Sequence, residues 1–239
     1  MRSGHSSLVF PAPPVPSVPV KGTDLLFPVN RVFCVGRNYE AHAREMGMAV
    51  DRDAPFYFIK SASSIVASGS AVPYAPGTSN LHHEMELVVA IGQAGFCVAE
   101  AGAPELIYGY ACGLDMTRRD LQFKARDKGR PWDLGKNFEN AAVISEIVMA
   151  VQSGHIETGD IRLSVNGDLR QVGDISDLIW KVPELIADLS KYYHLQPGDL
   201  LYTGTPAGVG PVEPGDTIKG SIDKVGEIEL TVADAENTH

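Results

Sequence analysis

Residues 80–92 read NLHHEMELVVAIG, an apolar run that opens with two histidines and two glutamates. In a β-strand that begins at Glu84, successive side chains alternate between the two faces. Glu84 and Glu86 then share one face and Met85 lies on the other. Two carboxylates at the mouth of a buried run repel each other and lose hydration. The pattern therefore predicts a positive group between them, either a basic side chain or a metal ion.

The composition of the chain is that of one large folded domain. It has 239 residues, of which 44% are hydrophobic and 21% charged, which suffices for a real core. Its 24 glycines and 16 prolines indicate a loop-rich, β-rich fold. The net charge of −10 argues against nucleic acid and anionic membranes as partners. No apolar stretch reaches the roughly 18 residues that span a bilayer, so we expect a cytoplasmic protein.

Neither the cysteines nor the N-terminal segment shows the pattern of a functional motif. Cys34, Cys97 and Cys112 all lie in stretches that resemble apolar strands, and their odd number and spacing argue against a disulfide framework or a zinc ribbon. We expect all three to be buried. Residues 1–24 hold five prolines between positions 11 and 19, which break any signal-peptide helix. We predict an extended surface arm over residues 1–24 and a single domain over residues 25–239.

Strand patterns dominate the rest of the chain. Apolar runs predict strands at residues 31–36, 84–91 and 106–115, and one or two more between residues 55 and 74. Asn166-Gly167 predicts a type I′ turn in a hairpin over residues 161–171. The sequence PGD occurs at residues 197–199 and 214–216, and each copy predicts a turn that enters a strand. Strands over residues 216–222 and 226–232 then close the domain.

Few helices are expected, and three can be placed. One spans residues 38–47, with Asn38 as N-cap and Gly47 just past its end. A second begins at Thr117, which has capping-box spacing to Asp120. A third covers residues 176–195 and restarts at Pro183. Strands with few helices and no βαβ alternation predict a β-rich α+β fold rather than a doubly wound parallel sheet.

A metal ion between the two glutamates would be a hard one. HHEME is not the zinc motif HExxH, since adjacent histidines cannot share a helix face. Carboxylates without thiols favour Mg²⁺, Mn²⁺ or Ca²⁺ over zinc. Asp115, at the end of another apolar run, is the candidate third ligand. Two alternatives stay open here: solvated carboxylates at Glu84 and Glu86, and a helix N-cap at Asp115.

Three further motifs carry candidate catalytic groups. His42 and Glu45 lie three apart on a predicted helix, so Glu45 could orient His42 as a general base, or the two form an ordinary exposed pair. Arg119 and Gln122 have the same spacing and could reach a substrate carboxylate and carbonyl, or form a solvated face. Lys136, in DLGKNF, either extends to solvent or acts electrostatically.

A glycine-rich stretch, TGTPAGVG at residues 203–210, is the last motif. It lacks the Gly-Lys-Ser/Thr ending of a P-loop and does not match GxGxxG. Its backbone N–H groups and the hydroxyls of Thr203 and Thr205 could still bind a small anion.

Five blocks together resemble a known family. In chain order they are FCVGRNYEAHAREMG, NLHHEMELVVAIG, GYACGLDMTRRDLQ, LGKNFENAAVIS and PGDLLYTGTPAGVGPVEPGD. They resemble the fumarylacetoacetate hydrolase family, in particular its small single-domain acylpyruvate and fumarylpyruvate hydrolases, over residues 25–233. The resemblance implies a mixed β-roll and a homodimer.

The resemblance also implies a role for each matching residue. Glu84, Glu86 and Asp115 match the family's Mg²⁺ or Mn²⁺ ligands. His42 and Glu45 match a base pair on a segment that orders over the substrate, and Lys136 matches a catalytic lysine. The matching substrate contacts are Lys60, Arg119, Gln122 and Thr205, with Arg37 as a further position.

The implied reaction is hydrolysis of the C–C bond of an acylpyruvate, such as fumarylpyruvate to fumarate and pyruvate, in aromatic catabolism. We expect the ion to bind the pyruvyl end of this small oxo acid, while His42 takes a proton from water and Lys136 and Gln122 stabilise the oxyanion. The alternatives are an oxaloacetate decarboxylase, a 2-hydroxyhepta-2,4-diene-1,7-dioate isomerase/decarboxylase and a non-catalytic binding protein of the same fold. The residues that select the acyl group are not placed by the sequence.

Overall fold

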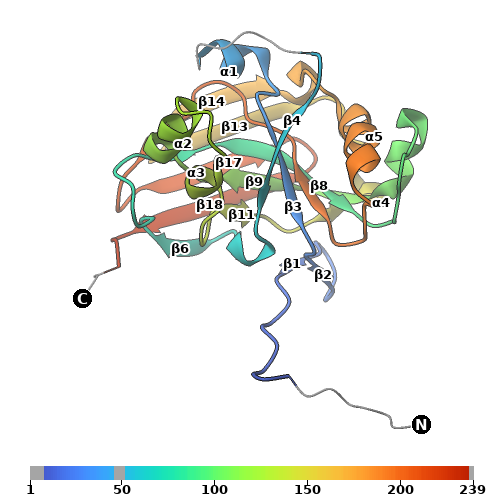
Figure 1. The fold of residues 1–239 in the computed structure, drawn as a ribbon, viewed down its shortest axis with the longest axis horizontal. Helices are drawn as coiled ribbons and strands as arrows, with labels where there is room; N and C mark the ends of the chain where they lie inside the picture. The colour runs from blue at the N-terminus through green and yellow to red at the C-terminus, as the bar shows by residue number, and fades with distance from the viewer. Residues whose placement is uncertain (1–7, 46–51, 237–239) are drawn as a thin grey trace.

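A large curved sheet forms the centre of the molecule in the computed structural model, which describes residues 8–45 and 52–236 (Figure 1). Strand β8 (Met85–Ile91) lies in its middle, antiparallel to both β9 (Ile107–Asp115) and β15 (Leu200–Tyr202). Every residue of β8 is buried, which explains its continuous apolar sequence. The other strands of this sheet are β3 (Val32–Gly36), β4 (Phe56–Lys60), β5 (Ile65–Ala67), β11 (Ala142–Ile144) and β12 (Val148–Met149).

A second sheet packs on one face of the first. Its five strands, in spatial order, are β14 (Asp168–Asp174), β13 (Asp160–Val165), β17 (Thr217–Ile222), β18 (Gly226–Ala233) and β6 (Ser70–Pro73). Met85 and Leu87 of β8 share the main core cluster with Ile161 and Ile218 of this sheet. Val88 lies in a separate cluster, on the opposite face of β8. The predicted alternation along β8 is therefore confirmed.

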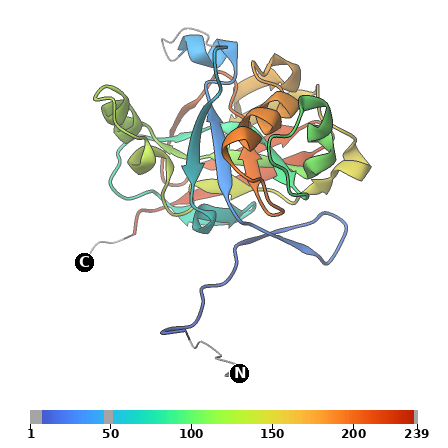
Figure 2. The same ribbon diagram turned by 45° about the vertical axis from the view of Figure 1, so that its right-hand side comes forward.

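Shorter elements complete the sheets. A three-stranded sheet joins β10 (Thr117–Arg118), β7 (Leu81–His83) and β16 (Gly210–Val212), and a hairpin joins β1 (Ser17–Pro19) to β2 (Leu26–Pro28). The helix α5 (Val182–Tyr192) and the 3₁₀ helix η2 (Glu100–Leu106) lie side by side on one flank. Figures 1 and 2 show α2 (Arg119–Arg126) and α3 (Asp133–Lys136) on the opposite flank. The remaining helices are α1 (Glu40–Glu45), α4 (Ala150–Ser153), η1 (Ala62–Ser64) and η3 (Ile175–Asp177).

The predicted fold class is confirmed, and so are most local predictions. Asn166 and Gly167 have φ angles of 53° and 88°, as the hairpin turn requires. Both PGD turns lead into strands, β15 and β17, and Pro183 lies in the first turn of α5. The segment between residues 55 and 74 contains three strands rather than one or two. Within the described ranges, no helix is long and apolar enough to span a bilayer.

Two predictions about helix starts are wrong. Thr117 lies in β10 and donates its hydroxyl to the carbonyl of Asp115 at 3.0 Å, so α2 begins later, at Arg119, without a side-chain cap. Asn38 does not cap α1 and is buried, with hydrogen bonds to the backbone of two distant segments. The predicted helix end at Gly47 lies outside the described residues.

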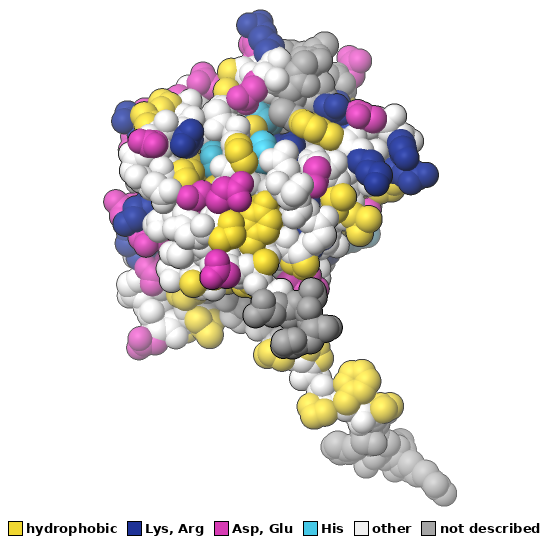
Figure 3. Space-filling view, turned by 90° about the vertical axis from the view of Figure 1, so that its left-hand side faces the viewer, with side chains coloured by type: hydrophobic (Ala, Val, Ile, Leu, Met, Phe, Trp, Pro, Cys, Tyr) yellow, Lys and Arg dark blue, Asp and Glu magenta, His cyan; other side chains and the backbone are white. Residues whose placement is uncertain are grey.

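Two predictions about burial are wrong in part. Cys34 and Cys112 are buried, but Cys97 is exposed in a loop with a φ angle of 49°. Figure 3 shows hydrophobic side chains on an N-terminal arm that projects from the body, and Leu8, Val9 and Phe10 are exposed. Residues 17–20 do not belong to the projecting arm, because residues 17–19 form strand β1 and both Val18 and Val20 are buried. The division into an arm and one domain at residue 24 stays a prediction.

Candidate metal centre and active site

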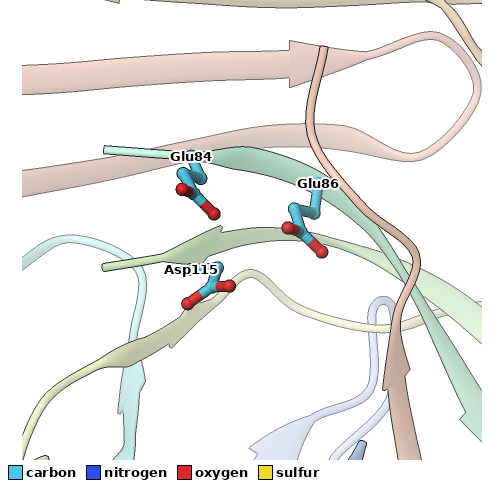
Figure 4. Close-up of side chains that lie close together, drawn as sticks. All are labelled: Glu84, Glu86 and Asp115. Carbon is cyan, nitrogen blue, oxygen red and sulfur yellow. The ribbon is translucent and has the colours of Figure 1, made fainter. Parts of the chain in front are cut away.

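Strand pairing brings three acidic residues together. Glu86 lies opposite Gly113 in the β8–β9 ladder, and the backbone N–H of Asp115 donates to the carbonyl of Glu84 at 2.9 Å. One carboxylate oxygen from each of Glu84, Glu86 and Asp115 lies within 4.8 Å of the other two. Figure 4 shows the three side chains converging from the two strands. All three are at most 4% exposed, so the alternatives of solvated glutamates and an N-cap aspartate are wrong.

Basic side chains lie against two of these carboxylates. The ammonium group of Lys136 donates to Glu84 at 2.6 Å, to Asp115 at 2.7 Å and to Thr117 at 2.7 Å. Arg119 donates to the other oxygen of Glu84 at 2.5 Å. Because Lys136 is buried and uses all three of its N–H groups, it is neither a solvated nor a snorkelling lysine.

Lys60 supports the cluster from behind. Its ammonium nitrogen lies 2.8 Å from Asp115 Oδ1 and donates to the backbone carbonyls of Met116, at 3.1 Å, and Lys136. The contact to Asp115 is therefore a buried ion pair, although this oxygen accepts no hydrogen bond. Three carboxylates thus face three cations, and a divalent ion would give the ionised cluster two net positive charges. Such a site suits an anionic substrate.

Glu86 differs from its neighbours because no basic side chain pairs with it among the described residues. Its one hydrogen bond comes from the backbone N–H of Gly204, at 2.8 Å. Burial, together with Asp115 and Glu84, raises the pKa of Glu86 well above its ordinary value. Burial alone would also raise the pKa of Glu84, but Lys136 and Arg119 lower it below the ordinary value. A hard divalent cation would satisfy the unpaired Glu86, and the three convergent carboxylates supply the oxygen ligands that it prefers, so the residues fit Mg²⁺ or Mn²⁺.

The first turn of α2 enters the site. Arg119 donates to Gln122 Oε1 at 2.6 Å and to His82 Nδ1 at 3.3 Å, and both α2 residues are buried rather than solvated. Burial and Arg119 lower the pKa of His82 to about 4, which keeps this imidazole a neutral acceptor. The predicted pairing of Arg119 and Gln122 on one helix face is therefore observed, with Arg119 fixed by its contacts to the protein.

His42 and Glu45 form a hydrogen-bonded pair on α1. Nδ1 of His42 lies 3.1 Å from Glu45 Oε2, and the His42 side chain is 8% exposed. Glu45 also accepts the backbone N–H of Gly208 at 3.2 Å. The pair is thus held against the 203–210 loop, with His42 buried and the Glu45 side chain 37% exposed, so the alternative of an exposed pair is wrong for His42 only.

The 203–210 loop binds protein carboxylates through its backbone. Gly204 N–H donates to Glu86 and Gly208 N–H donates to Glu45, so these groups are not free to bind an anion. Thr203 donates its hydroxyl to the carbonyl of Leu87 at 3.0 Å, which also removes it from the predicted anion cradle. Only Thr205 of the two threonines faces the pocket.

Gln171 is the buried polar residue that the sequence analysis missed. Its amide nitrogen donates to the Thr205 hydroxyl at 2.8 Å and to the Pro206 carbonyl at 2.9 Å. Its amide oxygen accepts the backbone N–H of Met85 at 3.0 Å and lies 3.1 Å from His83 Nδ1. Gln171 therefore ties the start of β8 to the 203–210 loop. A lone glutamine in a solvent-facing hairpin gives no sequence signal of this role.

The predicted residues surround one small pocket of about 30 Å³. Of the ten candidates, all but Glu45 and Lys60 line it, and those two contact lining residues from behind. Its other walls include Arg37, Phe58 and Trp132. The volume has room for one or two water molecules.

Comparison with known proteins decides the family. Residues 31–233 match the model of the fumarylacetoacetate (FAA) hydrolase C-terminal domain. The chain belongs to the fumarylacetoacetate hydrolase family. The predicted resemblance and the fold that it implied are therefore confirmed.

Members of this family with similar sequences carry two kinds of name. A fumarylpyruvate hydrolase of Ralstonia sp is 59% identical over 193 residues, which cover 80% of this chain and 100% of the relative. The mitochondrial oxaloacetate tautomerase of Homo sapiens is 41% identical, covering 80% of this chain and 86% of the relative. The crystal structure of fumarylpyruvate hydrolase from Pseudomonas aeruginosa, in complex with Mn²⁺ and pyruvate, superposes with a TM-score of 0.92 at 48% identity, covering 95% of this chain and 100% of that chain.

Proposed function

We propose that this protein is a metal-dependent hydrolase that cleaves the C–C bond of fumarylpyruvate to give fumarate and pyruvate. The observation that carries the proposal is the buried cluster of Glu84, Glu86 and Asp115 beside the His42–Glu45 pair. The relatives named fumarylpyruvate hydrolase, at 59% and 48% identity, support the choice of substrate.

The three carboxylates would hold Mg²⁺ or Mn²⁺, as their oxygen donors and the unpaired Glu86 favour. When bound, such an ion supplies a Lewis acid for the oxygens of the pyruvyl group and for the charge that leaves with pyruvate. The Pseudomonas aeruginosa relative that contains Mn²⁺ and pyruvate supports this assignment.

His42 would act as the general base. Its Nδ1–H donates to Glu45, so the lone pair is on Nε2 and can accept a proton from water. The hydroxide oxygen then bonds to the acyl carbonyl carbon, the C–C bond breaks, and its electron pair leaves with the pyruvate enolate. The enolate carbon takes up the proton that His42 removed from water, which restores the neutral base. Glu45 stabilises the imidazolium that forms in the first step.

Lys136 and Gln122 would stabilise negative charge in different ways. Because the three N–H groups of Lys136 already bind Glu84, Asp115 and Thr117, we infer that it acts through its charge. The amide N–H₂ of Gln122 has no hydrogen-bond acceptor among the described residues and can donate to an oxyanion. Arg119 and Thr205 would complete the wall around the substrate, and Lys60, which lies behind that wall, would add its positive charge.

We also infer a place in the catabolism of aromatic compounds, a homodimer and a cytoplasmic location. The family resemblance supports the first two. The acidic net charge of −10 is consistent with the last.

Enolisation of oxaloacetate is the second candidate, and the 41% identity to the human oxaloacetate tautomerase favours it. Tautomerisation moves a proton between carbon and oxygen and needs no hydrolytic water. The same acidic cluster could serve both reactions, since each passes through an enolate. The decarboxylase and isomerase alternatives draw on this enolate too.

The test is an assay of chelator-treated protein with and without Mg²⁺, using fumarylpyruvate, acetylpyruvate and oxaloacetate. Loss of enol absorbance is followed together with fumarate, pyruvate and CO₂ release. We expect fumarate and pyruvate in equal amounts, only when the metal is present. Fast interconversion of oxaloacetate tautomers with no cleavage of fumarylpyruvate would replace the hydrolase by the tautomerase.

A further inference from the structure

A larger cavity of about 640 Å³ adjoins the small pocket. The two share Arg37, Phe58, Trp132 and Lys136 as lining residues. The inner pocket is too small for a whole acylpyruvate, whereas the outer cavity has the size of typical small-molecule sites. A substrate whose pyruvyl end reaches the acidic cluster therefore has its acyl end directed at this cavity.

Aromatic rings form one wall of the cavity. The ring of Trp132 lies 4.8 Å from that of Phe56 and 6.1 Å from that of Phe58, both measured between centroids. Gly36 allows this packing, because a Cβ atom there would lie 2.6 Å from the Phe56 ring. Flat aromatic faces pack well against a planar conjugated chain.

Arg37 stands where the two spaces meet. Its guanidinium carbon lies 5.3 Å from the centroid of the Phe56 ring and 5.7 Å from that of Trp132. Its Nε atom is buried without a hydrogen-bond partner, and no acidic side chain pairs with Arg37 among the described residues. A φ angle of 63° places it in the left-handed region, which is uncommon for a residue other than glycine. An arginine held in this way is a ready partner for an anion from outside the protein.

The charged side chains that line the cavity are mainly positive, like Arg37 itself. Arg126 and Arg130 line it with Arg37, and Asp133 is the one acidic residue among its described lining. Arg126 is paired with Asp127 at 2.9 Å, outside the lining, whereas Arg37 faces both spaces.

We propose that this cavity holds the acyl end of the substrate, with Arg37 binding its distal carboxylate and the three aromatic rings packing on its conjugated chain. The inference rests on the proposed function, since it assumes that the pyruvyl end occupies the acidic cluster. It makes the enzyme selective for unsaturated, dicarboxylic acylpyruvates over acetylpyruvate, which has no distal carboxylate.

The test compares kcat/KM for fumarylpyruvate and acetylpyruvate in the wild type, Arg37→Met and Arg37→Lys. A hydrogen-bonded charge pair lost from the site lowers kcat/KM by about 10- to 100-fold. We expect Arg37→Met to lower kcat/KM for fumarylpyruvate by that factor relative to its effect on acetylpyruvate, mainly by raising KM. Arg37→Lys should lower kcat/KM for fumarylpyruvate by less. Arg162→Met is the matched control, because Arg162 lies on β13, is exposed and pairs with Asp160.

Equal losses on the two substrates would overturn the inference, and so would a wild type that shows no preference for fumarylpyruvate. Calorimetry of fumarate binding to the Mg²⁺-loaded protein adds a readout without turnover. Weaker binding to Arg37→Met supports the distal site, and unchanged binding contradicts it. A wild type that leaves fumarylpyruvate uncleaved but binds fumarate through Arg37 would contradict the proposed reaction instead.

Discussion

Replacing Glu86 by glutamine separates metal binding from folding. The amide keeps the shape of the side chain and can still accept the N–H of Gly204 at 2.8 Å. It removes a negative charge that burial and two neighbouring carboxylates already disfavour in the metal-free protein. We therefore expect Glu86→Gln to leave the metal-free stability unchanged or raised, while the protein loses affinity for Mg²⁺ or Mn²⁺.

The size of the effect follows from linkage. An ion that binds only the folded state, at 100 times its Kd, stabilises the protein by about 2.7 kcal/mol. For a chain of this length each kcal/mol moves Tm by about 2–4 °C, so the wild type should melt about 5–11 °C higher with metal than in chelator. The variant should shift by less than about 2 °C at the same ion concentration.

The pH dependence of the metal-free proteins gives a second readout. A carboxyl group whose pKa is raised on folding stabilises the folded state below its ordinary pKa, and this stability is lost as pH rises through the raised value. The metal-free wild type should therefore lose stability as pH rises from the ordinary pKa of a glutamate through the raised pKa of Glu86. Glu86→Gln should lose less stability over that pH range. Metal affinity of the wild type should rise over the same range, because the ion displaces a proton.

Thermal melts in chelator and in metal, at several pH values, measure both effects. Glu213→Gln, at an exposed position, is the control for loss of one acidic charge and should keep the full metal shift. An equal metal shift in Glu86→Gln and wild type would refute the reasoning.

Three other substitutions test the pocket. His42→Ala should slow fumarate release by about 10²- to 10⁴-fold and keep the metal-dependent melting shift, and an unchanged rate would contradict the base assignment. Gln171→Leu removes the donor to Thr205 and leaves buried backbone groups unpaired. Denaturant unfolding should therefore show a free energy of unfolding lower by about 2–5 kcal/mol, and an unchanged value would show that water replaces the amide. Gly204→Ala should lower Tm, because φ is 104° and the new Cβ would lie 2.7 Å from that of Asn38; an unaltered melt would show that the loop can shift.

The parts of the fold that follow local rules could be predicted from the sequence. The Asn166-Gly167 turn and the two PGD turns depend on backbone preferences of the residues themselves. The shared face of Glu84 and Glu86 follows from the period of a strand. Asp115 could be proposed as a third ligand from its place at a strand end, but the pairing that sets it beside Glu84 is a long-range contact.

The errors arise where a tertiary contact outweighs a local preference. Thr117 has the spacing of a capping residue, yet its hydroxyl donates to the carbonyl of Asp115 and accepts a hydrogen bond from Lys136. Asn38 resembles a helix cap but crosslinks the backbone of Thr203 and Trp180. Cys97 follows an apolar residue, a pattern that predicts burial, but its segment turns outward beside α5. Apart from Asp115, which is two residues from Thr117, these partners are distant in sequence, so no local pattern reveals them.

The loop at residues 203–210 has a consequence for how such enzymes can diversify. One short segment binds Glu86 through the N–H of Gly204 and Glu45 through the N–H of Gly208. It therefore fixes the distance between the acidic cluster and the His42–Glu45 pair. Most of the lining of the aromatic cavity comes from other stretches, residues 56–59 and 126–133, although Arg37 and Lys136 are shared with the inner pocket. Substitutions in those stretches can therefore change which acyl group is accepted. They leave the distance between the acidic cluster and the His42–Glu45 pair unchanged.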